Sequence, residues 1–219
     1  NFEEEVYPQL VAQNKLFATM TEHQYYSVGS FERIKFTEEF FKPKRVVFLD
    51  RDGTINKRPA RACYIEKPEE FVWLPGAIEA IHMLKKNGFL VIIITNQPGI
   101  ARGNLTEEML HCIHEKMRAD LLKERTEIDD IFYCPHNWDD GCFCRKPNPG
   151  MIFEAQKKYS LNLSECYLIG DDERDIAAGE AAGCICRMVD EKYTVLDVAK
   201  EIVSLEKKEK IHDYFKDTP

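Results

Sequence analysis

From residue 45 onward, apolar and polar positions follow two spacings that alternate along the chain. Short runs that are apolar throughout are separated by longer stretches in which apolar residues recur every three or four positions, the spacing of an amphipathic helix. The short runs predict strands at 45–49, 89–95, 130–134, 166–170 and 184–189. The longer stretches predict helices at 75–88, 106–124, 149–159 and 173–182. Because strands that are apolar along their whole length are typical of a parallel sheet covered on both faces, the sequence predicts a doubly wound, Rossmann-like α/β domain.

The two ends of the chain depart from this pattern. Residues 1–44 are aromatic-rich and irregular, and Pro43 stands just before the first strand, so we place a domain boundary there. Residues 194–215 predict a C-terminal helix whose charged run, "EKKEK", forms a solvated face. The expected parts are therefore an N-terminal segment to residue 44, an α/β domain over 45–190 and a C-terminal helix within 191–219.

Composition narrows the possible partners. The 219 residues are 44% hydrophobic, enough for one good core, and the net charge is −8. A negative chain repels polyphosphate backbones, so we expect no nucleic-acid partner, and a phosphorylated substrate must meet a local cationic pocket. No run reaches the ~18 to 20 apolar residues of a membrane span, and the first residues do not form a signal peptide. We expect a cytoplasmic protein with no membrane partner.

Polar side chains stand where the expected strands end. Asp50 and Asp52 follow the first strand at alternate positions, so their carboxylates point to the same side. Thr95 ends the second strand, Lys146 lies in the loop after the third, and Asp171 follows the fourth. Because the carboxyl ends of parallel strands share one edge of a sheet, we expect all five to converge. Paired acids alone would more often form an acidic turn, but this set favours a cation site beside a nucleophilic carboxylate.

These residues form four motifs in one order along the chain. They are Asp50-x-Asp52-Gly-Thr, then Thr95, then Lys146, then Gly170-Asp171-x3-Asp175. From residue 45 to about residue 190 the sequence resembles the haloacid dehalogenase superfamily of phosphohydrolases. The resemblance implies an α/β fold of that type, here with an added cysteine-rich loop and a short N-terminal appendage.

The resemblance also implies a role for each polar residue. Asp50 would be the nucleophile and Asp52 the general acid and base, and Mg²⁺ would be held by Asp50, the main-chain carbonyl of Asp52, and Asp171. Lys146 and the Thr95 hydroxyl would offset the negative charge that repels a carboxylate from a phosphate ester. The second acid favours an ester phosphatase, since dehalogenases and P-type ATPases of this superfamily are expected to lack it.

A second cluster, in "CPHNWDDGCFC", contains only residues that bind soft metals. Cys134 and His136 form one pair at positions i and i+2, and Cys142 and Cys144 form another. In an extended chain each pair points to one face, so the two pairs can close a tetrahedron around Zn²⁺. Such a site is structural because no position is open for water. Disulfides are the weaker alternative in a cytosolic chain.

The zinc loop leads directly into two cations, Arg145 and Lys146, which a fixed loop would hold at the phosphate site. The stretches "TNQPGIARG" (95–103) and "CRKPNPGM" (144–151) resemble the superfamily branch of heptose-bisphosphate and histidinol-phosphate phosphatases, and the heptose enzymes more closely. The resemblance implies loss of the 7-phosphate from a small phosphorylated sugar. It differs at Asp172, where a substrate-contacting lysine is expected. The expected substrate contacts, including a basic loop for a second phosphate, are Asn96, Gln97, Arg145, Tyr64, Arg58 and Arg61.

Other functions stay open at this point. Histidinol phosphate is the alternative substrate, although the basic loop favours a bisphosphate over a cationic amine. "TNQPGIARG" also resembles a motif of polynucleotide 3'-phosphatases, but the acidic balance and the zinc loop disfavour that class. A non-catalytic scaffold is disfavoured because the whole catalytic set is present.

The N-terminal segment carries a separate resemblance. Residues 1–41 resemble the closing portion of sugar-nucleotide nucleotidyltransferases. The glycine-rich, nucleotide-binding start of that family is absent from this sequence, so we expect no nucleotidyl transfer by it. The resemblance implies a phosphatase fused to or associated with a nucleotidyltransferase domain. The alternative is a plain extension that packs on the phosphatase.

Overall fold

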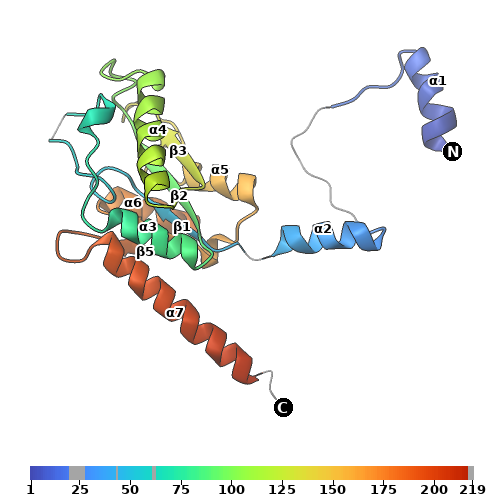
Figure 1. The fold of residues 1–219 in the computed structure, drawn as a ribbon. Helices are drawn as coiled ribbons and strands as arrows, with labels where there is room; N and C mark the ends of the chain where they lie inside the picture. The colour runs from blue at the N-terminus through green and yellow to red at the C-terminus, as the bar shows by residue number, and fades with distance from the viewer. Residues whose placement is uncertain (20–27, 43, 61–62, 217–219) are drawn as a thin grey trace. The chain divides into compact units, whose positions relative to one another are not determined.

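The computed structural model describes residues 1–19, 28–42, 44–60 and 63–216, and its contacts divide the chain into two compact units, Asn1–Lys42 and Pro43–Pro219. The described residues of the first unit form a π-helical turn and two α-helices (Figure 1). These are η1 (Phe2–Val6), α1 (Tyr7–Ala12) and α2 (Phe31–Phe41).

Helix α2 corrects the expectation that the whole N-terminal segment is irregular. It begins at Ser30, whose side chain accepts a hydrogen bond from the Arg33 main-chain N–H at 3.3 Å. This serine is a standard N-cap that satisfies one of the free amides at the start of the helix. The helix was not predicted because the aromatic residues of the segment do not recur at the spacing that forms one clear apolar stripe.

The second unit is built on a five-stranded parallel sheet in the order β3-β2-β1-β4-β5. The strands are β1 (Val46–Leu49), β2 (Leu90–Asn96), β3 (Asp130–Cys134), β4 (Tyr167–Gly170) and β5 (Ile185–Met188). Leu49 at the end of β1 is in register with Ile93 of β2 and with Ile169 of β4. The chain adds strands first on one side of β1 and then on the other, so the loops after β1 and β4 diverge and leave room for a ligand between them.

Helices cover both faces of this sheet. They are α3 (Ala77–Lys86), α4 (Glu107–Lys123), α5 (Gly150–Tyr159), α6 (Glu173–Ala182) and α7 (Val195–Lys216), with 3₁₀ turns η2 (Pro68–Glu70) and η3 (Leu163–Glu165). Helices α3, α4 and α7 pack on one face, and α5 and α6 pack on the other. The predicted doubly wound α/β fold is confirmed. Among the described residues, no helix has the length and apolar character that crossing a bilayer requires.

Strand β1 is the centre of the core. Val47 and Leu49 pack into the cluster under α3, α4 and α7, and Val46 and Phe48 pack into the cluster under α5 and α6. All four side chains are fully buried, which fixes the register of the strand because a slip by one residue would exchange its two faces. The rigid strand thereby fixes the position of Asp50, the next residue along the chain.

Candidate active site

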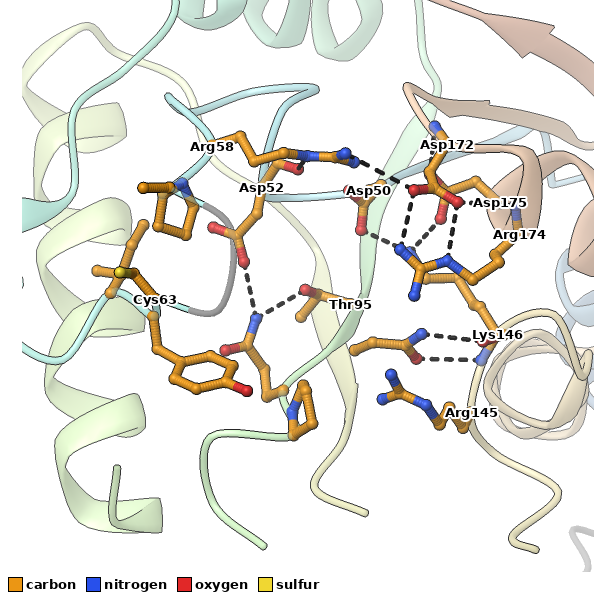
Figure 2. A pocket seen from close by; sticks show the side chains of 17 residues that line it. Asp50, Asp52, Arg58, Cys63, Thr95, Arg145, Lys146, Asp172, Arg174 and Asp175 are labelled. Atoms are coloured by element: carbon orange, nitrogen blue, oxygen red, sulfur yellow. Dashed lines mark hydrogen bonds and ion pairs between the residues drawn. The ribbon is translucent and has the colours of Figure 1, made fainter. Parts of the chain in front are cut away.

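A cavity of about 220 Å³ opens at the carboxyl ends of the strands (Figure 2). The four residues expected to perform catalysis line it, and so do five of the six expected substrate contacts. These nine residues are Asp50, Asp52, Thr95, Lys146, Asn96, Gln97, Arg145, Tyr64 and Arg58. The sixth expected contact, Arg61, lies outside the described residues. Asp171 lines a neighbouring cleft.

The most buried charged side chains of the cavity are one lysine and the two aspartates that it contacts. The Lys146 ammonium lies 2.5 Å from Asp50 Oδ1 and 2.6 Å from Asp175 Oδ1, and it donates a hydrogen bond to the Ile94 carbonyl at 2.9 Å. Burial raises the pKa of Asp50 to about 7, against the opposing effect of Lys146. Burial alone would lower the pKa of Lys146, but the two carboxylates raise it. The lysine therefore stays charged beside the expected nucleophile.

Asn96 holds the main chain of Lys146 in place. Its side-chain Oδ1 accepts a hydrogen bond from the Lys146 N–H at 3.0 Å, and its Nδ2 donates to the Lys146 carbonyl at 3.0 Å. An amide side chain here imitates the pairing of two strands. The Asn96 oxygen and one of the two Nδ2 hydrogens are thus engaged, which gives Asn96 a supporting position in addition to its place on the cavity wall.

Asp52 lies in a dense network of donors. Its carboxylate accepts hydrogen bonds from Arg51 Nη2 at 2.8 Å, Asn56 Nδ2 at 2.9 Å and Gln97 Nε2 at 3.0 Å. Burial alone would raise the pKa of Asp52, but Arg51 and these hydrogen bonds lower it. Gln97 Nε2 also donates to the Thr95 hydroxyl oxygen at 2.9 Å. The hydroxyl proton of Thr95 is thus left to point at a ligand in the cavity.

A group of carboxylates at the edge of the cavity, two of which line it, has the composition of a hard-cation site. One oxygen each from Asp50, Asp171 and Asp175 lies within 4.8 Å of the other two. Arg58 contacts two of the oxygens expected to bind metal, because its Nη2 lies 2.8 Å from Asp171 Oδ2 and its Nε donates to the Asp52 carbonyl at 3.2 Å. Burial raises the pKa of Asp171. An all-oxygen, anionic donor set of this kind fits Mg²⁺.

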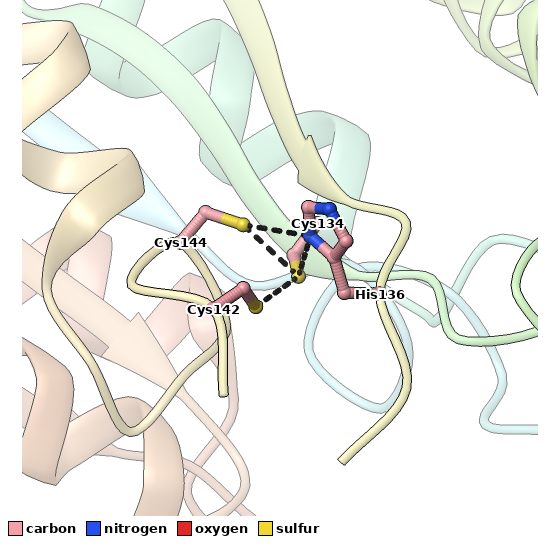
Figure 3. Close-up of side chains that lie close together, drawn as sticks. All are labelled: Cys134, His136, Cys142 and Cys144. Atoms are coloured by element: carbon pink, nitrogen blue, oxygen red, sulfur yellow. Dashed lines mark hydrogen bonds between the residues drawn. The ribbon is translucent and has the colours of Figure 1, made fainter. Parts of the chain in front are cut away.

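The cysteine and histidine cluster is brought together as expected (Figure 3). Cys134 Sγ lies 3.6 Å from Cys142 Sγ and 3.3 Å from Cys144 Sγ, and His136 Nδ1 lies 3.2 Å from Cys144 Sγ. A tetrahedral zinc site with Zn–S bonds of about 2.3 Å has ligand separations of about 3.8 Å, so the four groups fit zinc with small adjustments. The cysteines are all free thiols, and no disulfide competes for them.

The cluster is connected to the cavity through main-chain hydrogen bonds. The Gln97 N–H donates to the carbonyl of Cys134, the last residue of β3, at 2.8 Å, which extends the pairing of the two strands one residue past the end of β2. Arg145 Nη1 donates to the His136 carbonyl at 3.3 Å. Hydrogen bonds thus connect the cluster both to the end of β2 and to Arg145, the first cation after Cys144.

Arg174 is a cavity residue that sequence reasoning missed. Its guanidinium makes two hydrogen bonds of 2.8 Å with the carboxylate of Asp172, which lower the pKa of that acid. Figure 2 shows this pair at the rim, above Lys146 and Arg145. The heptose-enzyme pattern has a substrate-contacting lysine at the position that Asp172 occupies in this chain. The sequence signal that could have identified this cation is Arg174 itself, two residues after Asp172. It lies in the first turn of α6, from which its side chain reaches the cavity rim.

The parallel α/β fold and the acidic site at the ends of its strands are those of a phosphohydrolase, and comparisons with known proteins agree with this class. Residues 3–183 match the model of the haloacid dehalogenase-like hydrolase family. The chain belongs to this family. The resemblance inferred from the motifs is confirmed.

Similar proteins within the family carry a more specific name. D-glycero-alpha-D-manno-heptose-1,7-bisphosphate 7-phosphatase of Photorhabdus laumondii is 44% identical over 64% of this chain and 78% of its own length. The beta-anomer enzyme of Bordetella bronchiseptica is 39% identical over 64% and 77%. The crystal structure of D,D-heptose 1,7-bisphosphate phosphatase from B. bronchiseptica, complexed with magnesium and phosphate, has a TM-score of 0.69 and 33% identity, covering 73% of this chain and 98% of that one.

Gly53 offers a test of how closely the loop after β1 packs on the acidic group. It has φ +107°, and a Cβ atom there would lie 1.9 Å from Asp171 Oδ2. We expect Gly53→Ala to lower the free energy of unfolding by about 2 to 4 kcal/mol, from backbone strain and displacement of Asp171 together. Urea denaturation measures this difference.

Gly103→Ala is the matched control, because Gly103 has φ +72° but nothing within 4 Å of its Cβ position. It should lose only the cost of a positive φ, about 1 kcal/mol. Equal losses in the two variants would show that the close approach to Asp171 has no energetic weight.

Proposed function

We propose that this chain is a Mg²⁺-dependent phosphomonoester hydrolase that removes the 7-phosphate of D-glycero-D-manno-heptose 1,7-bisphosphate. The observation that carries the proposal is a buried Asp50 that faces the cavity with Lys146 beside it and a second carboxylate, Asp52, on the same loop. The names of the relatives supply the substrate.

In the first half-reaction a carboxylate oxygen of Asp50 attacks phosphorus, and the bond from phosphorus to the sugar oxygen breaks. Lys146 and the Thr95 hydroxyl donate to the phosphate oxygens, where negative charge accumulates. When bound to Asp50, the Asp52 carbonyl and Asp171, Mg²⁺ supplies charge neutralisation that lets two anions approach each other. Asp50 then carries the phosphoryl group as an acyl phosphate.

Asp52 moves the protons of both half-reactions. A phosphate dianion entering the cavity raises the pKa of Asp52, because like charge disfavours its carboxylate form. The protonated acid gives its proton to the departing sugar oxygen, which would otherwise leave as an alkoxide. As a carboxylate again, Asp52 takes a proton from the water that attacks phosphorus, and the bond to Asp50 breaks. Phosphate leaves and both acids return to their starting forms.

The cations of the cavity support a substrate with a second phosphate. Arg58, Arg145 and Arg174 line the same cavity as the nucleophile. A bisphosphate offers one phosphate to Lys146 and a second anion to these guanidinium groups, which bind phosphate oxygens in pairs. Histidinol phosphate instead carries a cationic amine, which has no acceptor to which a guanidinium group can donate.

Phosphate release tests the function and the substrate together. We expect Mg²⁺-dependent turnover of one or both anomers of the heptose bisphosphate, and turnover at least tenfold slower with histidinol phosphate or a 3'-phosphorylated oligonucleotide. Asp50→Asn should retain less than about one thousandth of the activity, since the nucleophile is lost. Asp139→Asn, an exposed acid in the cysteine loop, is the control and should be unaffected. Preference for histidinol phosphate, or turnover by Asp50→Asn, would contradict the proposal.

We also propose that Cys134, His136, Cys142 and Cys144 hold a structural Zn²⁺. The four donors approach the spacing of a closed tetrahedral site, in which no coordination position is left for water. Bound zinc would fix the loop that ends at Cys144, and with it the cation that follows two residues later.

Zinc removal is expected to lower turnover without touching the reacting groups. Cys142→Ala should lose zinc, measured by mass spectrometry under native conditions, and should lower kcat by about tenfold or more because Lys146 is less well placed. Excess Mg²⁺ should not restore the rate. Cys112→Ala, which removes an exposed thiol on α4, is the control. Full turnover in a zinc-free sample would refute the idea that the cluster supports the site.

The N-terminal unit supports a third proposal, that this chain is fused to or works with a sugar nucleotidyltransferase. On this unit Phe17, Phe31 and Phe36 expose 90%, 89% and 73% of their surface. Large exposed aromatic side chains are typical of a segment that contacts another domain. Sequencing of the gene region upstream of Asn1 tests it, and the absence of a nucleotidyltransferase domain there and of any such partner would refute it.

A further inference from the structure

Arg51 is the largest charged side chain of the core, and the reaction described above does not use it. It lies between Asp50 and Asp52 in sequence, and its side chain is 0% exposed. A guanidinium group has five N–H donors and no acceptor, so burying it is costly unless acceptors surround it. The positions of those acceptors show what the side chain is for.

One side of the guanidinium holds Asp52. Arg51 Nε lies 3.2 Å from Asp52 Oδ1, and Nη2 lies 3.1 Å from Oδ1 and 2.8 Å from Oδ2. Neighbours in an extended chain point in opposite directions, but here the chain turns, with the Ile55 N–H donating to the Arg51 carbonyl at 3.0 Å. The fork of donors fixes both the direction and the plane of the carboxylate.

The other side of the guanidinium faces a histidine from a distant helix. Arg51 Nη1 lies 3.3 Å from Nε2 of His114, a residue of α4 that is only 6% exposed. Because arginine only donates, Nε2 must be the acceptor, and His114 is neutral with its proton on Nδ1. Burial, with the nearby Arg51 charge, lowers the pKa of His114 to about 3, in agreement with this assignment.

We propose that Arg51 and His114 are positioning residues that hold the Asp52 carboxylate in the orientation that proton transfer requires. This inference rests on the proposed function, in which Asp52 is the acid and base. The Asp52 side chain is 21% exposed, and Asn56 and Gln97 each donate to one of its oxygens, whereas Arg51 donates to both oxygens and so sets the rotamer and the plane of the carboxylate. The contact with α4 connects that rotamer to the core of the domain.

The proposal separates two kinds of leaving group. An ester oxygen leaves only if Asp52 supplies a proton as the bond to phosphorus breaks. A sulfur atom in the same bridging position leaves as a thiolate, because alkyl thiols have a pKa near the value of about 8.5 of free cysteine. A misplaced Asp52 therefore slows kcat/KM for the oxygen ester and spares the sulfur ester, since kcat/KM ends at the first irreversible step and excludes water attack.

The test compares the heptose bisphosphate with its analogue carrying sulfur at the 7-bridging position. His114→Phe keeps an aromatic ring but removes the acceptor, and we expect kcat/KM to fall about 100-fold for the oxygen ester and less than about threefold for the sulfur ester. His114→Gln offers a carbonyl acceptor to Arg51 and should recover most of the loss. His111→Phe, an exposed position one turn earlier on α4, is the control and should match the wild type.

Arg51→Lys gives an independent arm, because it keeps the positive charge and removes the fork. It should show the same selective loss for the oxygen ester. Equal losses for both esters in His114→Phe, or no loss for either, would overturn the inference, and so would failure of His114→Gln to recover activity. A wild-type enzyme that cleaves neither ester would instead refute the proposed function, so the two failures are distinguishable.

Discussion

The concentration of negative charge at one edge of the sheet is the constraint on which the site depends. Asp50 and Asp52 follow β1, and Asp171 and Asp175 lie between the end of β4 and the first turn of α6, so the sheet brings the four acids together, and each would be expensive to bury alone. A cation contacts each of them in the structure. Lys146 contacts Asp50 and Asp175, while Arg51 contacts Asp52 and Arg58 contacts Asp171.

These cations differ in what surrounds them, and the difference sorts their roles. Arg51 is enclosed by the core, and its partners are fixed protein groups on either side. Lys146 is also buried, but it lies on the cavity wall beside Asp50, the proposed nucleophile. The Arg58 side chain is 47% exposed and stands over oxygens that a divalent ion would bind. Arg51 therefore supports the site from within the core, and Lys146 is placed to contact a ligand in the cavity. Arg58 is exposed enough to move away from the oxygens when a metal ion binds.

Much of the fold was accessible from the sequence because each strand is apolar throughout and each motif stands at a strand end. The polar residues after β1, β2 and β4 and the cysteine loop after β3 followed from that periodicity and from the resemblance together. The contact between Arg51 and His114 could not be predicted, because the two residues are 63 positions apart and their contact depends on how α4 packs over the loop. Arg174 belongs to no motif, and helix α2 lacks the apolar stripe that would reveal it.

The clamp of Asn96 on the main chain of Lys146 has a consequence for how the cysteine loop can vary. Lys146 is fixed by a strand residue on one side, and Cys134 is paired with the same strand end through Gln97. The return turn between these fixed points exposes Trp138 and carries a glycine with open space around it. Residues 138–141 of this turn include none of the four expected zinc-binding side chains, so they can change in length and composition, and a binding segment or a label inserted there would leave Lys146 where it is.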